Sequence, residues 1–270
     1  MDLNTIKEIA RPSARSDLPV WAAGDAWLAG GTWLFSEPQA HLNRLIDLTD
    51  LKWPALTIDA HGLSIAATCT IAQLDSFACP PDWLAAPLFN QCCRAFLASF
   101  KIWKTATVGG NLCMSLPAGP MISLASALDG VCTIWQLDGG ERKLAVADFV
   151  TGNNTNVLNQ GELLRQIELP LAALKRRTAF RQMSLTPVGR SAALLIGTID
   201  SSGAFALTVT ASTKRPVKLA FARMPDAAEL LEAIAQAIPD ALYHDDVHGK
   251  PFWRKHMTRR LAEEIRGELA

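Results

Sequence analysis

The feature that most constrains this chain is a long segment without charge. Between Thr105 and Leu128 there is no Lys, Arg, Asp, Glu or His. A helix needs about 20 apolar residues to cross a bilayer, so the segment is long enough to do so. Three glycines and two prolines interrupt it, however, and such a backbone would leave hydrogen-bonding groups unsatisfied in lipid. The sequence therefore predicts no membrane insertion, and instead a glycine-rich segment buried within a globular fold.

Composition and charge narrow the class of protein further. The chain has 270 residues, enough for one large or two modest domains. Its 26 basic and 26 acidic side chains cancel, so no net field attracts a nucleic acid. Charged residues make up only 19%, against about 25% in typical soluble domains, while apolar types reach 49%. This balance predicts a subunit whose surface is partly covered by protein partners, and no nucleic-acid partner.

Cysteine usage and the N-terminal sequence indicate a cytoplasmic protein. The six cysteines include no CxxC pair, and a chain of this size needs no disulfides for stability. The first 21 residues mix charges with prolines and lack the apolar core of a signal peptide. We therefore expect reduced thiols in a cytoplasmic location.

Short apolar runs alternate with helical patterns along the first part of the chain. Thr70 and Gln73 have the spacing of a capping box that opens a helix through Phe77, and residues 87–98 show helical spacing. The alternation indicates a mixed α and β fold. Strands are expected at residues 26–29, 45–48, 63–67, 131–137 and 164–169.

The sequence changes character after Lys175, where a second domain is expected to begin. Antiparallel strands are predicted at residues 192–200 and 204–210, around a turn that ends at Gly203. Two helices follow at residues 227–238 and 251–269. Each helix has an apolar stripe, formed by Leu230, Leu231 and Ile234 in the first and by Trp253, Met257, Leu261 and Ile265 in the second.

Two glycine pairs are the features most relevant to function. They lie in AGGT at residues 29–32, directly after a predicted strand, and in TVGGN at residues 107–111. Consecutive glycines let the main chain approach a ligand closely and direct successive N–H groups at phosphate oxygens. A tight turn alone accounts for a single pair, but two pairs flanked by hydroxyl and amide side chains suit a pyrophosphate held from both sides. Neither pair has the spacing of a Rossmann or P-loop fingerprint.

No acid–base group accompanies these loops. The uncharged segment holds no general acid or base, so no catalytic residue is predicted and the chemistry must come from a bound cofactor. The cluster of His244, Asp245, Asp246 and His248 is open to interpretation as a metal site. A solvated loop in which Asp246 caps the final helix accounts for the same residues, and no metal site is predicted.

A series of further motifs follows the two glycine motifs along the chain: Pro117-Ala118, ALDG at residues 127–130, Asp148-Phe149, ELLRQIELP at residues 162–170 and DVHGKPFWR at residues 246–254. This order resembles the FAD-binding subunit of the molybdenum hydroxylases, the family of xanthine dehydrogenase and aerobic carbon monoxide dehydrogenase. The resemblance implies an α+β fold with a two-subdomain FAD-binding domain of the PCMH type at residues 1–172. Its subdomains would span about 1–52 and 53–172, and a smaller C-terminal domain at 173–270 would hold an antiparallel sheet and helices.

The resemblance also implies a cofactor, partners and a set of contacts. The partners would be a small subunit with two 2Fe-2S clusters and a large subunit that carries the molybdenum cofactor and oxidises the substrate. This chain would be the oxidoreductase subunit that passes electrons to an external acceptor. FAD would contact Ala29, Gly30, Gly31, Thr32 and Trp33 in the first loop, Thr107, Gly109, Gly110 and Asn111 in the second, and Pro120 and Leu163 elsewhere.

The sequence departs from the family pattern at four positions. Trp103 and Lys104 stand where an Arg-Asn pair is usual, Pro120 where an acidic residue contacts the flavin's sugar-like chain, and Gln182 where a lysine is common. Pro120 and Gln182 favour a rival interpretation, a flavin-free structural or assembly subunit of the same fold. A stand-alone flavoenzyme is a weaker rival, because no catalytic base or substrate-binding charge cluster accompanies the loops.

Overall fold

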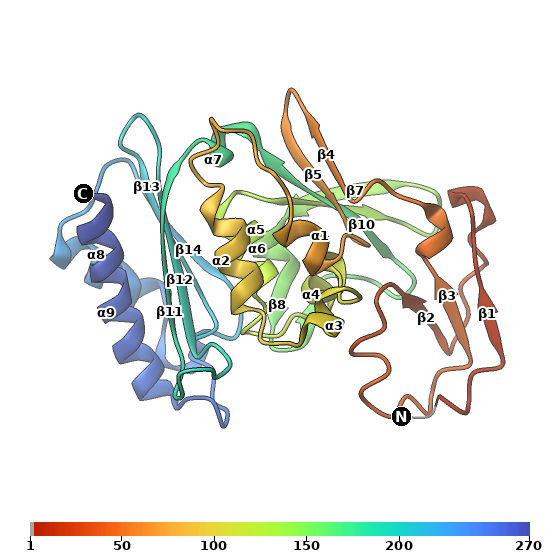
Figure 1. Ribbon diagram of the computed structural model, residues 1–270. Helices are drawn as coiled ribbons and strands as arrows, with labels where there is room; N and C mark the ends of the chain where they lie inside the picture. Colours follow the sequence, from red (N-terminus) through yellow and green to blue (C-terminus); the bar gives the residue numbers. More distant parts are fainter. Residues whose placement is uncertain (1–2) are drawn as a thin grey trace.

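The structure is a computed structural model that describes residues 3–270. Figure 1 shows three main sheets arranged across the molecule in the order of the sequence, with the N-terminal sheet at the right and the C-terminal sheet and helices at the left. The mixed α and β architecture expected from the sequence is confirmed. Within the described residues no helix is both long and apolar enough to cross a membrane.

The N-terminal sheet is small and parallel. It contains β1 (Glu8–Ala10), β2 (Asp25–Leu28) and β3 (Arg44–Asp47) in the order β1-β3-β2. Arg44 donates to both carboxylate oxygens of Asp25, at 2.9 and 2.6 Å, and these hydrogen bonds lower the pKa of that buried carboxyl. The pair fixes β2 against β3, and with it the point where the first glycine loop leaves the sheet. The short 3-10 turns here are η1 (Arg15–Asp17) and η2 (Thr49–Leu51).

The central sheet is antiparallel, with strand order β4-β5-β10-β6-β7. Its strands are β4 (Leu56–Asp59), β5 (Gly62–Ala66), β6 (Val131–Trp135), β7 (Glu141–Ala145) and β10 (Leu163–Pro170). A separate pair is formed by β8 (Val150–Gly152) and β9 (Thr155–Asn156). All strands expected in this region are present, with ends within two residues of the predicted ones.

Helices pack on one face of the central sheet and enclose the main hydrophobic core. They are α1 (Ile71–Asp75), α2 (Pro87–Ala95), α3 (Phe100–Trp103), α4 (Val108–Met114), α5 (Pro120–Ala127), α6 (Val146–Phe149) and α7 (Leu171–Leu174). Thr70 and Gln73 form the predicted capping box of α1. Every residue of α5 is buried, between α2 on one side and β12 and β13 of the next sheet on the other. The uncharged segment is therefore a buried part of the fold, as the sequence predicts.

The C-terminal sheet is antiparallel with strand order β11-β12-β13-β14, and the predicted hairpin forms its centre. Its strands are β11 (Arg177–Met183), β12 (Ala193–Ile199), β13 (Phe205–Thr210) and β14 (Val217–Phe221). They are followed by α8 (Ala227–Ala237), η3 (Asp240–Leu242) and α9 (Pro251–Leu269). Helix α9 lies against β11 and β12, and a Cβ on Gly197 would approach Ile265 Cγ2 to 2.2 Å, so only glycine permits this packing.

Two details of the C-terminal region differ from the sequence-based expectation. Leu231 is 39% exposed, because the buried stripe of α8 is formed by Leu230 and Ile234, and the next residue is rotated by about 100° around the helix. Asp246 does not cap α9, whose N-cap is Lys250. The Asp246 carboxylate instead accepts a hydrogen bond from the buried Arg254 guanidinium, which needs a counter-charge.

Candidate functional site

The two glycine loops are in direct contact. Gly30 lies so near the second loop that an added Cβ would stand 1.8 Å from the carbonyl oxygen of Thr105 and 2.7 Å from its carbonyl carbon. Thr105 precedes the N-cap of α4, Thr107, by two residues. Glycine at position 30 is thus required for the approach. The structure brings together the two loops that the sequence assigns to one site.

The first loop presents a row of unpaired backbone donors. Gly31 has φ +67°, and Phe35 N–H donates to its carbonyl oxygen at 2.8 Å, which closes a turn. The N–H groups of Gly30, Gly31, Thr32 and Trp33 donate to no other group within residues 3–270. Successive free N–H groups in a turn form a concave anion site. This loop fits a pyrophosphate through its backbone, with Trp33 38% exposed at its edge.

The second loop differs, because its N–H groups are already used within the protein. Val108 N–H donates to Cys69 O at 2.8 Å and Gly109 N–H to Ala67 O at 3.0 Å. Gly110 N–H donates to Thr107 Oγ1 at 3.0 Å, an N-cap bond of α4. The expectation that these glycines direct free N–H groups at phosphate is therefore wrong. Gly109 serves packing instead, since a Cβ there would lie 2.5 Å from Ala67 Cβ.

Side chains of the second loop keep their donors available. The Thr107 hydroxyl accepts from Gly110 N–H and has no acceptor of its own among the described residues. The Asn111 carbonyl oxygen Oδ1 accepts from Met121 N–H at 3.1 Å, at the start of α5, while its amide nitrogen Nδ2 has no partner in that part of the chain. Pro120, the residue before Met121, is buried and has no N–H to offer. Pro120 thus lies beside the second loop without contributing a polar side-chain group.

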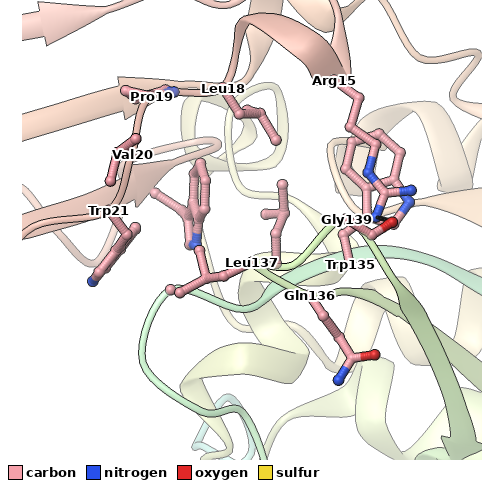
Figure 2. A pocket seen from close by; sticks show the side chains of 12 residues that line it. Arg15, Leu18, Pro19, Val20, Trp21, Trp135, Gln136, Leu137 and Gly139 are labelled. Carbon is pink, nitrogen blue, oxygen red and sulfur yellow. Dashed lines mark hydrogen bonds between the residues drawn. The ribbon is translucent and has the colours of Figure 1, made fainter.

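Leu163, the remaining predicted contact, opens β10 and pairs with Trp135 of β6. It lines a cavity of about 280 Å³ together with Trp27 of β2. Figure 2 shows this cavity, whose walls come from residues 15–21, β2 and the β6–β7 hairpin. Sequence reasoning did not identify Trp21, Trp27 and Trp135 as a group. The only signal is the excess of eight tryptophans over one tyrosine, which says nothing about which of them meet.

An ion pair joins the segment before β10 to the rest of the site. Arg142 donates to both carboxylate oxygens of Glu162, at 2.9 and 2.6 Å, and these bonds lower the pKa of Glu162 to about 2. Arg142 also donates to Val157 O at 2.8 Å, which holds the loop that leads into β10. The carbonyl oxygen of Glu162 accepts from Trp27 Nε1 at 3.0 Å, so the same residue ties the N-terminal sheet to the central one.

The remaining departures from the family pattern are each accommodated locally. Trp103 Nε1 donates to Phe96 O at 3.2 Å, and Lys104 is exposed at the end of α3. Gln182 is exposed on β11 and donates to Ser191 Oγ at 2.9 Å.

Burial raises the pKa of the Cys113 thiol, on α4, to about 12, so Cys113 is not a reactive thiolate at neutral pH.

Comparisons with known proteins place these features in a family. The family model of the FAD-binding domain in molybdopterin dehydrogenase matches residues 11–172, which is more than half of the chain. The beta subunit of caffeine dehydrogenase from Pseudomonas sp. (strain CBB1) is 26% identical over 169 residues, covering 62% of this chain and 55% of that protein. The match therefore spans about half the length of this relative.

Solved structures confirm the predicted fold class. Quinoline 2-oxidoreductase from Pseudomonas putida 86 superposes with a TM-score of 0.79 at 18% identity, covering 100% of this chain and 98% of the other. Reconstituted CO dehydrogenase from Oligotropha carboxidovorans superposes with a TM-score of 0.81 at 22% identity, covering 99% of each chain. Likeness at these identities establishes the fold, while the family match carries the cofactor. The chain belongs to the family of FAD-binding domains of molybdopterin dehydrogenases, and its cofactor is FAD.

Proposed function

We propose that this chain is the FAD-binding electron-transfer subunit of a heteromeric molybdenum hydroxylase. It takes electrons from the 2Fe-2S clusters of a small partner subunit and passes them to an external acceptor, while substrate is oxidised in a large subunit with the molybdenum cofactor. The observation that carries the proposal is the row of unpaired N–H groups from Gly30 to Trp33, held against the second loop. Caffeine dehydrogenase, whose beta subunit is similar to this chain, is a dehydrogenase of more than one subunit by its name.

The chain's own residues bind and orient the cofactor. Backbone N–H groups of residues 30–33 hold the pyrophosphate, and the Thr107 hydroxyl and Asn111 amide donate to it or to the adjoining sugar-like chain. Bound FAD supplies the redox chemistry, because flavins exchange electrons that side chains cannot. The work of this subunit is positioning, and no residue of the chain is assigned a catalytic proton transfer.

The domain organisation follows from the same proposal. Residues 1–172 form the FAD-binding domain, with subdomains of about 1–52 and 53–172, and residues 173–270 form the C-terminal domain. The division agrees with the sheets, since β1–β3 precede residue 52 and β11–β14 follow residue 173. We place the protein in the cytoplasm, consistent with cysteines that are all unpaired in the structure.

Exposed apolar side chains support a heteromer. Trp33 and Phe35 of the first loop are 38% and 44% exposed, and Leu97 and Phe100, ahead of the second loop, are 61% and 68% exposed. Large apolar groups left exposed on segments next to the two loops suit a surface that a partner covers. A partner seated there would lie next to the cofactor, as electron transfer requires.

The test is to titrate the purified chain with FAD and to repeat the measurement on the complex with its partner subunits. We expect one FAD per chain, a yellow protein, and bleaching of the flavin when the iron–sulfur subunit is reduced. A folded chain that binds no FAD alone or in the complex would contradict the proposal and favour the flavin-free assembly subunit. FAD that binds but stays oxidised in the reduced complex would refute the electron-transfer role alone.

A further inference from the structure

Unpaired positive charge gathers on the segment that leads into the second glycine loop. Residues 83–128 contain no acidic side chain, and their only charged groups are Arg94, Lys101 and Lys104. All three are exposed, and none forms an ion pair with a group in residues 3–270. The chain as a whole is neutral, so this local excess belongs to one surface and does not follow from the composition.

The fold holds these cations around an exposed aromatic ring. Trp103 Nε1 donates to Phe96 O at 3.2 Å, which holds α3 against the end of α2. Lys104 Nζ stands 5.9 Å from the ring centroid of Phe100, the first residue of α3, whose side chain is exposed. We call this surface the basic patch, and it consists of Arg94, Phe100, Lys101 and Lys104.

The basic patch borders the loops of the cofactor site. Thr105 follows Lys104 directly, and a Cβ added to Gly30 would stand 1.8 Å from its carbonyl oxygen. The first loop adds no opposite charge, because no charged residue lies between Asp25 and Glu37. In Figure 1 α3 lies next to α4, on the side of the helices toward the N-terminal sheet. A protein seated on the patch therefore lies beside the FAD site.

The unpaired lysines indicate a partner that binds and leaves. Lysine is depleted at the centre of permanent interfaces, because burying its charge costs free energy unless an ion pair compensates it. Exposed cations instead attract an acidic protein and raise its association rate by about 10- to 1,000-fold at low salt. The patch thus suits a transient partner with an acidic docking face, to which Phe100 offers one apolar contact.

A membrane surface fits the patch less well. Each cation near an anionic leaflet contributes about 1 kcal/mol, and recognition of such lipids typically uses about four to eight basic residues. The patch has three, and its helix α3 spans only Phe100–Trp103, which is too short to lie in the interface as an amphipathic helix. An acidic protein is therefore the better match.

We propose that the basic patch is the docking site of the external electron acceptor, and that this acceptor is a small acidic redox protein. The proposal rests on the function proposed above and names the class of acceptor. Oxidation of bound FADH2 to FAD releases two electrons and two protons, so two molecules of a one-electron carrier are reduced and the protons pass to solvent. Phe100 is thereby assigned to the acceptor, while Trp33 and Phe35 of the first loop are left to the partner subunits.

The test compares two forms of one carrier that differ in charge: cytochrome c, which is basic, and succinylated cytochrome c, whose lysines carry carboxylates. The complex with its partner subunits is loaded with FAD, reduced with dithionite, freed of excess reagent and mixed with either carrier. At about 0.01 M salt, where the Debye length is about 30 Å, we expect faster reduction of the succinylated form. The advantage should shrink at about 0.15 M, where that length is about 8 Å. Calorimetry on the oxidised partners measures affinity without turnover, and it should show the same preference.

The variant Arg94→Glu/Lys101→Glu reverses two charges of the patch and leaves Lys104, the cation nearest the loops, in place. It should slow reduction of the succinylated carrier by about 10-fold at low salt and abolish its advantage over native cytochrome c. The matched control is Arg177→Glu/Arg259→Glu, which reverses two exposed cations on β11 and α9 that also have no ion pair within the described residues. This control changes the net charge equally and should keep the preference for the succinylated form.

Several results would overturn the proposal. Equal rates of the unchanged complex with both carriers would show no charge preference, and equal losses in the patch and control variants would show an effect of net charge alone. A patch variant that no longer assembles with its partner subunits in gel filtration would assign the patch to a permanent interface. Binding to vesicles of equal parts phosphatidylserine and phosphatidylcholine that only the patch variant loses, without a preference between carriers, would assign it to a membrane. A complex that binds no FAD, or whose reduced form does not reduce the small uncharged acceptor benzoquinone, refutes the proposed function itself, which separates that failure from the others.

Discussion

Replacing Gly30 by alanine adds one methyl group at the point where the two glycine loops touch. The new Cβ would lie 1.8 Å from Thr105 O and 3.2 Å from Ala106 Cα, and both of these are backbone atoms that cannot rotate away. To reach a separation of 3.0 Å the loops must move apart by about 1.2 Å. Overpacking of this kind costs about 1–3 kcal/mol. Because a bound FAD needs both loops in register, we expect its affinity to fall by about 5- to 150-fold.

The assay is a titration of Gly30→Ala with FAD, followed by flavin absorbance and paired with a thermal melt of the FAD-free chain. Gly267→Ala is the matched control, because nothing lies within 4 Å of a Cβ at that helical position. It should bind FAD normally and gain up to about 1 kcal/mol of stability from better helix propensity. If Gly30→Ala binds FAD as tightly as Gly267→Ala, the close approach of the loops is not what forms the site.

Three further predictions test the surroundings of the site. Thr107→Ala removes the N-cap side chain of α4 and a free hydroxyl, so the free energy of unfolding should fall by about 1 kcal/mol, seen as a lower Tm, and FAD should bind more weakly, whereas Thr107→Ser should retain both. Because Arg142 holds the pKa of Glu162 at about 2, the stabilisation from this pair is complete above the ordinary carboxyl pKa of 4.5 and is lost as the pH falls toward 2. Glu162→Gln should therefore lower the Tm at pH 7 and flatten its decline in that window, and an unchanged acid limb would contradict the assignment. Arg254→Met removes the buried guanidinium that donates to Gly249 O, Ala192 O, Ala211 O and the Asp246 carboxylate, and it should cost about 3–5 kcal/mol in a urea melt. Arg254→Lys should not restore this loss, because one ammonium cannot replace a guanidinium that serves several acceptors.

The strands that sequence reasoning found and those it missed differ in their place in the sheets. The centres of the two antiparallel sheets, including β5, β6, β10, β12 and β13, were predicted from their apolar runs. The strands without a prediction were the short pair β8 and β9, the edges β4, β7, β11 and β14 of those two sheets, and β1 at one edge of the third sheet, whose other edge strand β2 was predicted. Edge strands are half-solvated, and β7 reads ERKLA with alternate residues exposed. Their strand character comes from pairing with a neighbour rather than from their own composition.

The site was predictable to the extent that it is encoded locally. Each glycine pair signals a close approach of the backbone, and neither Gly30 nor Gly109 has room for a Cβ, although Gly109 and Gly110 lie in the first turn of α4 and not in a tight turn. Whether the N–H groups are free to bind a ligand depends on carbonyl groups that are distant in the sequence. In the second loop the carbonyl oxygens of Cys69 and Ala67 accept from the N–H groups of Val108 and Gly109. No local pattern reports such a pairing. The aromatic cavity escaped prediction for the same reason, since Trp27 and Trp135 meet only after the sheets assemble.

The local surroundings of Pro120 and Gln182 show that these departures from the family pattern do not argue strongly against a bound flavin. Pro120 stands at the first turn of α5, where a missing N–H is harmless, and Asn111 serves the next N–H at Met121. Gln182 is paired with Ser191. Both substitutions are therefore satisfied within the protein, and what they remove is a single contact to the ligand, worth about 1.5–3 kcal/mol if charge-assisted. Four successive N–H groups of the first loop have no acceptor within the described residues, which suits a bound pyrophosphate and favours the flavin-binding interpretation over the flavin-free one.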